Sequence, residues 1–207
     1  MIIGFIGLIG SGKDTAADYL VNFHEFRKES FAGTLKDATA AVFGWDRTLL
    51  EGRTKQSRDW REKVDMWWSE RLGMPNLTPR WILQYWGTEV CRLGFHDDIW
   101  IASLENKMRQ TNDNIVISDV RFPNEIKAIH NVGGIVVRVT RGEDPYWFND
   151  AIKMNSGDEQ AKQRIQEQGI HSSETSWIGS KVDHVISNNG TVDALYQQIQ
   201  ELIKSPE

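Results

Sequence analysis

The first group of residues with the potential to bind a ligand or take part in catalysis is a glycine-rich stretch near the amino terminus. The stretch follows an apolar run from Ile2 to Ile6 and precedes a helical pattern, and it reads Gly7-Leu8-Ile9-Gly10-Ser11-Gly12-Lys13-Asp14-Thr15. Because glycines carry no Cβ atom, a tight turn here can aim successive backbone N–H groups at a ligand, and the dipole of the following helix adds positive potential. The stretch therefore predicts a phosphate-binding loop whose natural occupant is a polyphosphate.

The loop departs from the common pattern at one position. Asp14 stands directly after Lys13, where Ser or Thr usually contacts magnesium, and the hydroxyl comes one residue later at Thr15. This order is more similar to that of kinases acting on nucleotides and related metabolites than to that of GTPases or motor ATPases. The alternative interpretation is a glycine-rich turn that binds nothing, and the surrounding strand, loop and helix argue against it.

A second set of charged residues follows a short buried strand pattern, Ile115–Ile117. Asp119 ends this strand, and an acid at such a place holds magnesium or its waters in P-loop proteins. Arg121 follows closely and could neutralise a phosphate. Val120, rather than Glu, comes directly after Asp119, so the acid expected in ATPases that activate water is absent from that position.

A polar stripe is expected on a helix that begins at Thr78-Pro79, a cap followed by a proline in the first turn, and runs to Leu93. The stripe holds residues at four-residue spacing: Arg80, Gln84, Thr88 and Arg92. An amide beside guanidinium groups could read a base edge and clamp a phosphate. Gly87 in the middle of this helix costs about 1 kcal/mol relative to Ala, which suggests that another group approaches closely there.

The apolar patterns elsewhere alternate between strands and helices. Beyond the first strand, strands are expected at 26–31, 114–118, 134–140 and 182–187, and further helices at 14–23, 32–43, from 97 to 108, and 191–203. This alternation is typical of an open α/β fold, which binds ligands at the carboxyl edge of its sheet. Lys36 would lie near that edge, although a solvated helix lysine is an equally simple interpretation.

Two segments interrupt the alternation. Residues 45–78 are rich in Arg and Trp and are interpreted as a helical insert that covers an acceptor pocket, with an amphipathic helix carrying Trp60, Val64, Trp67, Trp68 and Leu72 on one face. Many of its arginines could instead balance nearby acids on a solvated face. Residues 142–177 are polar and have little to bury, so they are expected to form a mobile lid that opens and closes around a substrate.

Length and composition restrict the class of protein. A chain of 207 residues fits a single domain that contains such an insert and lid. The net charge of −5 argues against broad nucleic-acid binding, and the single Cys91 fits a reducing cytosol. We expect no membrane span and no signal peptide, and hence a cytoplasmic protein.

Taken together, the motifs resemble those of the bacteriophage deoxynucleoside monophosphate kinases. The resemblance rests on five stretches in family order: the loop 7–15, Ser30-Phe31-Ala32 with Leu35-Lys36, Leu83-Gln84-Tyr85-Trp86-Gly87-Thr88-Glu89 with Arg92, Asp119-Val120-Arg121-Phe122-Pro123-Asn124-Glu125, and the patch 171–174. It implies a P-loop NTPase-type α/β fold with three layers and a parallel sheet. It also implies ATP as phosphate donor with Mg²⁺, and a deoxynucleoside monophosphate as acceptor.

The resemblance assigns roles to particular residues. Lys13, Asp14 and Arg121 would be catalytic, and Thr15 and Asp119 would hold the metal. ATP would bind to Gly10, Ser11, Gly12, Lys13, Asp14 and Thr15. The acceptor would bind to Lys36, Gln84, Trp86, Arg92, Arg121 and Trp147, and a lid cation, Arg141 or Arg164, would help to neutralise the transferring group. Host cytoplasm, small-molecule nucleotide partners and a homodimer are compatible with this assignment.

Three other functions compete with this one. A kinase similar to dephospho-coenzyme A kinase would act on a hydroxyl group and would need a base, which Asp14 could supply. A nucleotide-hydrolysing switch or motor is disfavoured, because this sequence lacks the guanine-reading Asn-Lys-x-Asp motif and has no Glu after Asp119. A DNA-binding module could use the nine tryptophans for stacking, but the acidic charge argues against it.

Overall fold

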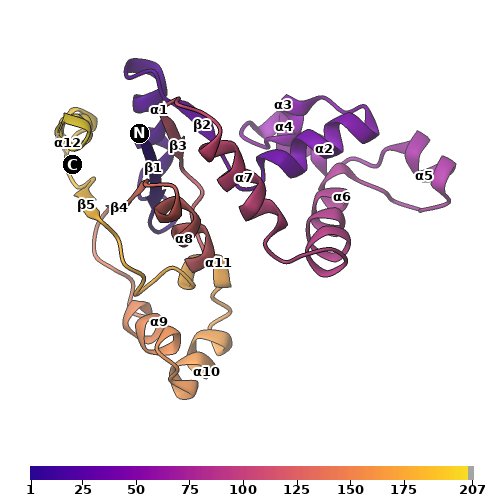
Figure 1. Cartoon of the computed structure of the whole chain (residues 1–207). Helices are drawn as coiled ribbons and strands as arrows, with labels where there is room; N and C mark the ends of the chain where they lie inside the picture. The colour runs from indigo at the N-terminus through magenta and orange to yellow at the C-terminus, as the bar shows by residue number, and fades with distance from the viewer. Residues whose placement is uncertain (205–207) are drawn as a thin grey trace. The chain divides into compact units, whose positions relative to one another are not determined.

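The computed structural model describes residues 1–204, and the chain divides into two compact units (Figure 1). Unit 1 comprises Met1–Ser30 together with the chain from Glu105 onward, and unit 2 comprises Phe31–Leu104. The phosphate-binding loop therefore belongs to unit 1. The Arg- and Trp-rich segment 45–78 lies inside unit 2.

Unit 1 is built on a five-stranded parallel sheet. Its strands are β1 (Ile2–Ile6), β2 (Arg27–Glu29), β3 (Ile115–Ile117), β4 (Ile135–Thr140) and β5 (His184–Ser187), in the order β2-β3-β1-β4-β5. The central β1 pairs Ile3 with Val116 of β3 and with Ile135 of β4. All five strands lie within the ranges predicted from the sequence, and the expected parallel α/β sheet is confirmed.

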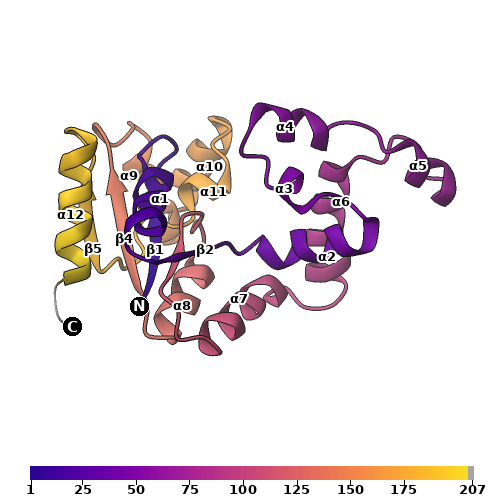
Figure 2. The ribbon, with the colours of Figure 1, turned by 90° about the horizontal axis from the view of Figure 1, so that it is seen from above.

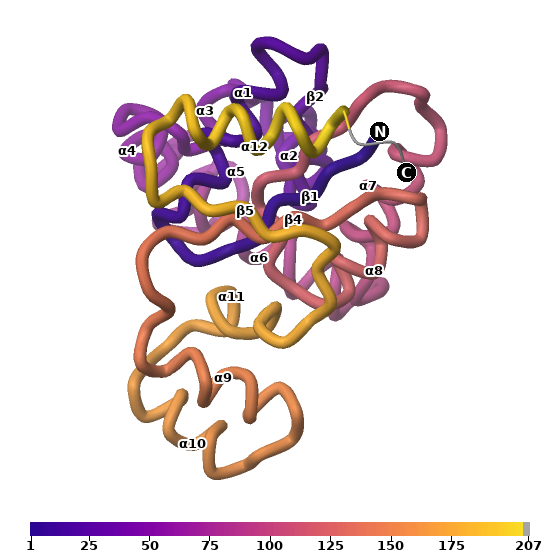
Figure 3. The backbone as a smooth tube through the Cα atoms, turned by 90° about the vertical axis from the view of Figure 1, so that its left-hand side faces the viewer, coloured from indigo at the N-terminus to yellow at the C-terminus, as the bar shows by residue number. Residues whose placement is uncertain are grey.

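Helices cover both faces of this sheet and complete three layers. Helices α1 (Lys13–Phe23) and α12 (Val192–Lys204) lie over the face to which Ile3 and Phe5 contribute, and the rings of Tyr19 and Tyr196 stack at 4.1 Å between them. Figure 2 shows α12 running alongside β4 and β5. Helix α8 (Pro123–Asn131) covers the opposite face (Figure 3).

The segment expected to be a lid contains three helices, α9 (Phe148–Asn155), α10 (Glu159–Glu167) and the short α11 (Ser172–Thr175). Figure 3 shows α9 and α10 side by side, apart from the sheet. The pair is better packed than the polar sequence suggests, because small residues do much of the packing: Ala151 and Ala161 are completely buried and Ile165 is 3% exposed. Asp158 caps α10 by accepting hydrogen bonds from the backbone N–H groups of residues 160 and 161, which separates the two helices.

Unit 2 is helical. It contains α2 (Gly33–Phe43), α3 (Arg47–Leu50), α4 (Lys55–Arg61), α5 (Met66–Leu72), α6 (Pro79–Tyr85), the π-helix η1 (Trp86–Leu93) and the beginning of α7 (Ile99–Arg109). Its core is a cluster of apolar side chains, five of which are buried: Phe43, Trp45, Leu50, Leu77 and Ile82.

The amphipathic helix predicted across residues 60–72 is wrong. Helix α4 ends at Arg61 and α5 begins at Met66, because the carboxylate of Asp65 accepts a hydrogen bond from the Trp68 backbone N–H (3.1 Å) and starts a new helix. The other oxygen of Asp65 accepts a hydrogen bond from Trp45 Nε1 at 2.8 Å. Trp67 is consequently 62% exposed rather than buried.

The helix predicted to begin at Thr78 is confirmed, with the Thr78 hydroxyl capping Trp81 N–H at 3.1 Å. Its second half, η1, is a π-helix rather than an α-helix. The close approach expected at Gly87 is confirmed, because a Cβ atom there would lie 2.9 Å from Leu35 Cδ2 and Trp100 Nε1 donates to the Gly87 carbonyl at 3.0 Å.

Within residues 1–204, no helix combines the length and the apolar character that crossing a membrane requires.

Candidate active site

The glycine-rich loop connects β1 to α1 and has the geometry of an anion cradle. Gly12 has a φ of +104°, and a Cβ atom there would lie 2.3 Å from the Asn188 side-chain nitrogen. A Cβ atom at Gly7 would lie 2.3 Å from the Val139 carbonyl oxygen. Both positions therefore require glycine, and the loop can press closely against β4 and the turn after β5.

Lys13 begins α1 and its side chain turns back over the loop. Its Nζ donates hydrogen bonds of 2.8 Å to the carbonyl oxygens of Gly7 and Leu8. Burial lowers the pKa of Lys13 below its usual value, and the charge of Arg121 lowers it further, while the carboxylate of Glu174 opposes the change. The ammonium group is thus positioned at the mouth of the loop, among charges of both signs.

Asp14 is stabilised as a carboxylate by Lys28 of β2 and by Ser118, which directly follows β3. Its Oδ1 accepts hydrogen bonds from Ser118 Oγ at 2.8 Å and from Lys28 Nζ at 3.0 Å. Partial burial would raise the pKa of Asp14, but these hydrogen bonds and the positive charges of Lys28 and Lys13 lower it overall. Lys28 therefore supplies the cation that a carboxylate beside phosphates requires.

A cavity of about 350 Å³ opens over the loop. Its lining comes from the loop, the start of α1, the turns after β4 and β5, and the start of α12: Gly10, Gly12, Lys13, Asp14, Thr15, Arg141, Asn188, Gly190 and Val192. The structure thus brings together five of the six residues expected to bind ATP. The sixth, Ser11, is buried, and its carbonyl oxygen accepts a hydrogen bond from Asn188 Nδ2 at 2.9 Å.

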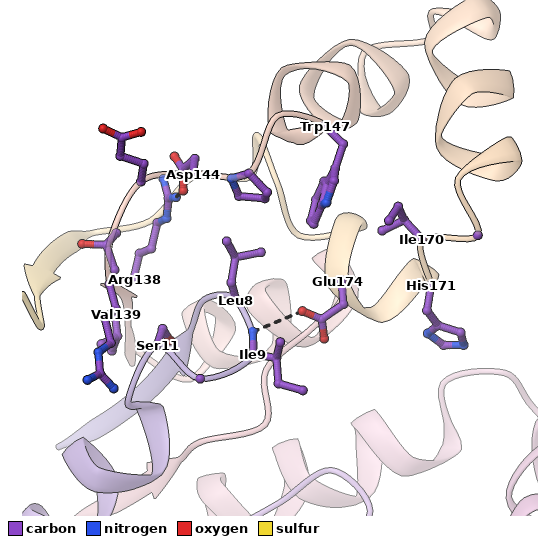
Figure 4. A pocket seen from close by; sticks show the side chains of 16 residues that line it. Leu8, Ile9, Ser11, Arg138, Val139, Asp144, Trp147, Ile170, His171 and Glu174 are labelled. Atoms are coloured by element: carbon purple, nitrogen blue, oxygen red, sulfur yellow. Dashed lines mark hydrogen bonds and ion pairs between the residues drawn. The ribbon is translucent and has the colours of Figure 1, made fainter.

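A second cavity of about 500 Å³ lies against the outer side of the loop and shares Gly10 and Arg141 with the first (Figure 4). Figure 4 shows the Trp147 indole pointing into this cavity above Leu8, with Ile170 beside it and Glu174 below. The cavity therefore combines apolar walls with a few polar groups, as small-molecule sites do.

Arg121 lies two residues before α8, and its side chain contacts Ser173 and Glu174 of unit 1. Its backbone N–H donates to Glu125 Oε2 at 2.7 Å, which fixes the main chain. Its guanidinium donates to Ser173 Oγ at 3.0 Å and lies 3.7 Å from Glu174 Oε1. The sequence therefore identified a cation that approaches the loop.

The two candidate lid cations differ in their surroundings. Arg141 is exposed and lines both cavities. Arg164 forms an ion pair with Asp150 across α9 and α10, with Nη2 2.7 Å from Oδ1. Arg141 is therefore available to a ligand in the loop, whereas Arg164 joins two helices.

The remaining acceptor candidates lie in unit 2. Lys36 Nζ is bound to Glu51 at 2.8 Å, and the Trp86 ring packs edge to face on Phe43 with ring centroids 5.4 Å apart. Gln84 is exposed, and Arg92 is half-buried and makes no ion pair within residues 1–204. Gln84 and Arg92 are thus open to a ligand, while Lys36 and Trp86 also have structural contacts.

The metal candidates have suitable chemistry. Thr15 lines the loop cavity, and Asp119 follows β3 and is half-buried. Hydroxyl and carboxylate oxygens are ligands that Mg²⁺ accepts, usually together with substrate phosphates and waters. Nowhere in residues 1–204 do three or more His, Cys, Asp or Glu side chains gather as a metal site.

Three residues at the loop were given no role by the sequence: Lys28, Ser118 and Glu174. Lys28 and Ser118 reach Asp14 from β2 and from the end of β3, a contact that pairs residues far apart in the chain. The carboxylate of Glu174 accepts a hydrogen bond from the Ile9 backbone N–H at 3.2 Å. Asp14 offered the one signal, because a carboxylate beside phosphates needs a cation; the sequence led us to expect magnesium or a lid arginine there, and the structure places Lys28 beside it.

Two solved structures align with this chain over nearly its whole length at low sequence identity. Among solved structures, shikimate kinase from Aquifex aeolicus has a TM-score of 0.44 and 12% identity, covering 99% of this chain and 96% of that one. Dephospho-CoA kinase from Campylobacter jejuni has a TM-score of 0.38 and 17% identity, covering 98% and 95%.

Two curated proteins are more similar in sequence. A protein of Acanthamoeba polyphaga mimivirus named "Putative deoxynucleotide monophosphate kinase" is 31% identical over 214 residues, covering 96% of this chain and 94% of its own. The deoxynucleoside-5'-monophosphate kinase of Escherichia phage T5 is 24% identical over 211 residues, covering 76% and 84%.

A parallel sheet whose central strand runs into a phosphate-binding loop defines a P-loop NTPase-type α/β protein. The model of the family described as "Deoxynucleotide monophosphate kinase" matches residues 69–199. The chain belongs to the deoxynucleotide monophosphate kinase family, and the resemblance found in its motifs is confirmed.

Proposed function

We propose that this protein transfers the terminal phosphate of ATP to a deoxynucleoside monophosphate, giving ADP and a deoxynucleoside diphosphate. The observation that carries the proposal is the loop itself, in which Lys13 and the amide groups after β1 face a cavity of about 350 Å³. Family membership supports the choice of a nucleotide acceptor.

The chemistry requires little from the protein beyond alignment. A phosphate monoester has its second pKa near 6, so the attacking oxygen is already ionised near neutral pH and needs no general base. Catalysis then consists of holding the two nucleotides in line and neutralising the charge that develops. The loop amides and Lys13 would hold the donor phosphates, and Arg121 with Arg141 would neutralise the transferring group.

The environment of Asp14 argues against transfer to a hydroxyl group. Such an acceptor would need a base whose pKa lies near the operating pH. The pKa of Asp14 is lowered, and its carboxylate is already bound by Ser118 and Lys28. Asp14 is therefore better suited to order Lys28 and the metal environment than to accept a proton.

Thr15 and Asp119 are the residues we propose for Mg²⁺, with Asp119 acting directly or through water. When bound, the ion would supply positive charge to the phosphates of ATP. The protein's own part is to offer the two oxygen donors on the loop side of α1 and at the end of β3.

For the acceptor we propose two sets of ligands, each within its own unit: Arg121 and Trp147 in unit 1, and Lys36, Gln84, Trp86 and Arg92 in unit 2. Trp147 is favoured by the apolar cavity that it lines with Leu8 and Ile170, where an aromatic ring could stack on a base. Arg92 is favoured by its lack of an ion pair in the part of the chain that the structure describes.

The organisation of the chain is part of the proposal. Residues 45–78 would form the insert on the acceptor side of a single kinase domain, and residues 142–177 would act as a mobile lid. We also propose a cytoplasmic location, without nucleic-acid or membrane partners. A homodimer is compatible with this proposal.

A coupled assay of ADP release tests the function. The purified protein would be offered each common deoxynucleoside and ribonucleoside monophosphate with ATP and Mg²⁺, and we expect turnover with at least one deoxynucleotide. Dephospho-coenzyme A and an assay without acceptor are the controls. Turnover only with dephospho-coenzyme A, or rapid ATP hydrolysis without any acceptor, would contradict the proposal.

A further inference from the structure

Glu174 is a carboxylate placed directly against the phosphate-binding loop. Its Oε2 accepts a hydrogen bond of 3.2 Å from the backbone N–H of Ile9, and its Oε1 lies 3.7 Å from the Arg121 guanidinium. The side chain is 24% exposed and also lines the cavity that contains Trp147 (Figure 4). One carboxylate thus contacts two groups that are suited to bind a phosphate.

The segment that carries Glu174 is well anchored. The backbone N–H of Ser173 donates to His171 Nδ1 at 3.1 Å and starts α11. The Asn155 side chain donates hydrogen bonds of 2.8 Å to the carbonyl oxygens of Thr175 and Ile178, and Thr175 is only 2% exposed. These hydrogen bonds join the segment of Glu174 to α9, so Glu174 keeps a fixed place relative to that helix within the segment 142–177.

Carboxylate and phosphate are both anions with oxygen acceptors, so they compete for the same donors. The Ile9 N–H belongs to the loop, and the Arg121 guanidinium lies beside Glu174 and donates to Ser173 Oγ, so Glu174 contacts a donor of each kind from one place. Donors that are oriented before the substrate arrives avoid a reorganisation cost during the reaction.

We propose that Glu174 is a positioning residue that holds the Ile9 N–H and the Arg121 guanidinium until a phosphate group takes over both contacts. Its charge then repels that phosphate, so Glu174 weakens anion binding while it improves alignment. The inference rests on the proposed function in that the phosphate belongs to a nucleotide. It assigns to α11 the task of ordering the loop and Arg121 in the absence of substrate.

Binding of simple anions tests the charge effect without any assumption about the acceptor. Calorimetry would compare wild-type protein with Glu174→Gln, using inorganic tripolyphosphate as a probe for the donor phosphates and inorganic phosphate as a probe for the acceptor phosphate. Glu174→Gln keeps an oxygen that can accept from Ile9 but loses the negative charge. We expect at least one probe to bind about threefold to tenfold more tightly.

Two further variants separate the charge from the contact. Glu174→Asp keeps the charge, and we expect its anion affinity to stay within about twofold of the wild type. Glu167→Gln removes the same charge from α10, where the carboxylate accepts a hydrogen bond from the exposed Gln163 side chain at 2.8 Å, and serves as the matched control. Tighter binding by Glu167→Gln equal to that of Glu174→Gln would overturn the inference.

The kinetic readout distinguishes positioning from simple structural support. In the coupled assay Glu174→Gln should lower kcat about tenfold while its anion affinity rises, because Arg121 is less well aligned. A structural defect would weaken anion binding and activity together, and that result would refute the positioning role. If the wild type phosphorylates no deoxynucleotide but the affinity shift is present, the proposed function fails and the Glu174 contact stands.

Discussion

The ammonium group of Lys13 is held at the mouth of the loop by two carbonyl oxygens, those of Gly7 and Leu8. We predict that Lys13→Ala lowers kcat by about 100-fold or more, because a preorganised charge contact with the transferring phosphate is lost. The coupled assay measures the change, and circular dichroism checks that the fold is intact. Lys127→Ala on the exposed face of α8 is the control.

A Lys13→Ala variant that keeps more than about a tenth of the wild-type kcat would contradict this role, since the expected loss is at least tenfold larger.

The half-buried guanidinium of Arg92 is the best candidate in unit 2 for binding the acceptor phosphate. We predict that Arg92→Ala raises KM for the deoxynucleotide about tenfold and leaves KM for ATP within twofold, because a charge-assisted contact is removed from one substrate only. Initial rates at varied concentrations of each substrate measure both constants.

Arg71→Ala, which removes an exposed arginine from the last turn of α5, is the comparison for Arg92→Ala. A rise in KM for ATP alone would show that the acceptor stripe is wrongly placed.

At the scale of single elements, local rules predicted much of the structure. The Thr78-Pro79 start, the glycine loop and all five strands follow from capping, backbone freedom and short apolar runs, which act over a few residues. The helix across 60–72 was predicted wrongly because the apolar spacing is compatible with one helix, while Asp65 starts a new one. The spacing of apolar residues in η1 likewise gives no indication that this segment is a π-helix.

The part of the candidate site that is formed by neighbouring residues in the sequence could be predicted. The glycine-rich motif identified five residues that line the loop cavity: Gly10, Gly12, Lys13, Asp14 and Thr15. The contacts of Lys28 and Ser118 with Asp14, and of Glu174 with Ile9, join residues that are separated by up to 165 positions. Such contacts depend on strand order and on the path of the segment after β4, which a single sequence does not specify.

Helices α2 and α3 of unit 2 are joined by Glu51, whose carboxylate accepts from Lys36 Nζ at 2.8 Å and from the Arg47 guanidinium. Burial would raise the pKa of Glu51, but these two cations outweigh it and lower the pKa from 4.5 to about 2. The carboxylate therefore stabilises unit 2 above its unfolded pKa, and this contribution is lost as the pH falls from about 4.5 to about 2.

We predict that Glu51→Gln lowers the free energy of unfolding by about 2 kcal/mol at pH 7 and by much less at pH 2 to 3. Unfolding in denaturant, monitored by tryptophan fluorescence, measures this change in the free energy of unfolding. Glu62→Gln, which removes a carboxylate from an exposed pair with Arg80 at 3.3 Å, is the control. If Glu51→Gln lowered the free energy of unfolding equally at both pH values, the ion pairs of Glu51 would not be the source of the lost stability.

At the scale of the whole molecule, each unit has a core made of its own residues. The proposed ATP site belongs to unit 1, so a ligand that binds only there should stabilise that unit first. We predict that ATP with Mg²⁺ at about 100 times its Kd slows hydrogen exchange in β1, α1 and α12 by up to about 100-fold. Core amides of unit 2 around Phe43 and Ile82 should change little.

Hydrogen exchange followed by mass spectrometry resolves the two units, and the Lys13→Ala variant with the same ATP is the control. Equal protection of both units would show that they unfold together, and no protection of unit 1 would show that the loop does not hold the nucleotide.

Gly4 on β1 sets how closely α8 lies on the sheet, since a Cβ atom there would be 2.5 Å from Ile129 Cδ1 and 3.1 Å from Val120 Cγ2. A larger residue at this position would push against the fully buried Ile129 side chain, and α8 would move outward unless that side chain turned aside. The main chain at Arg121 is tied to that helix through Glu125, so its guanidinium would be lifted as well. Gly4, a residue that makes no polar side-chain contact, thus affects where the guanidinium group of Arg121 lies.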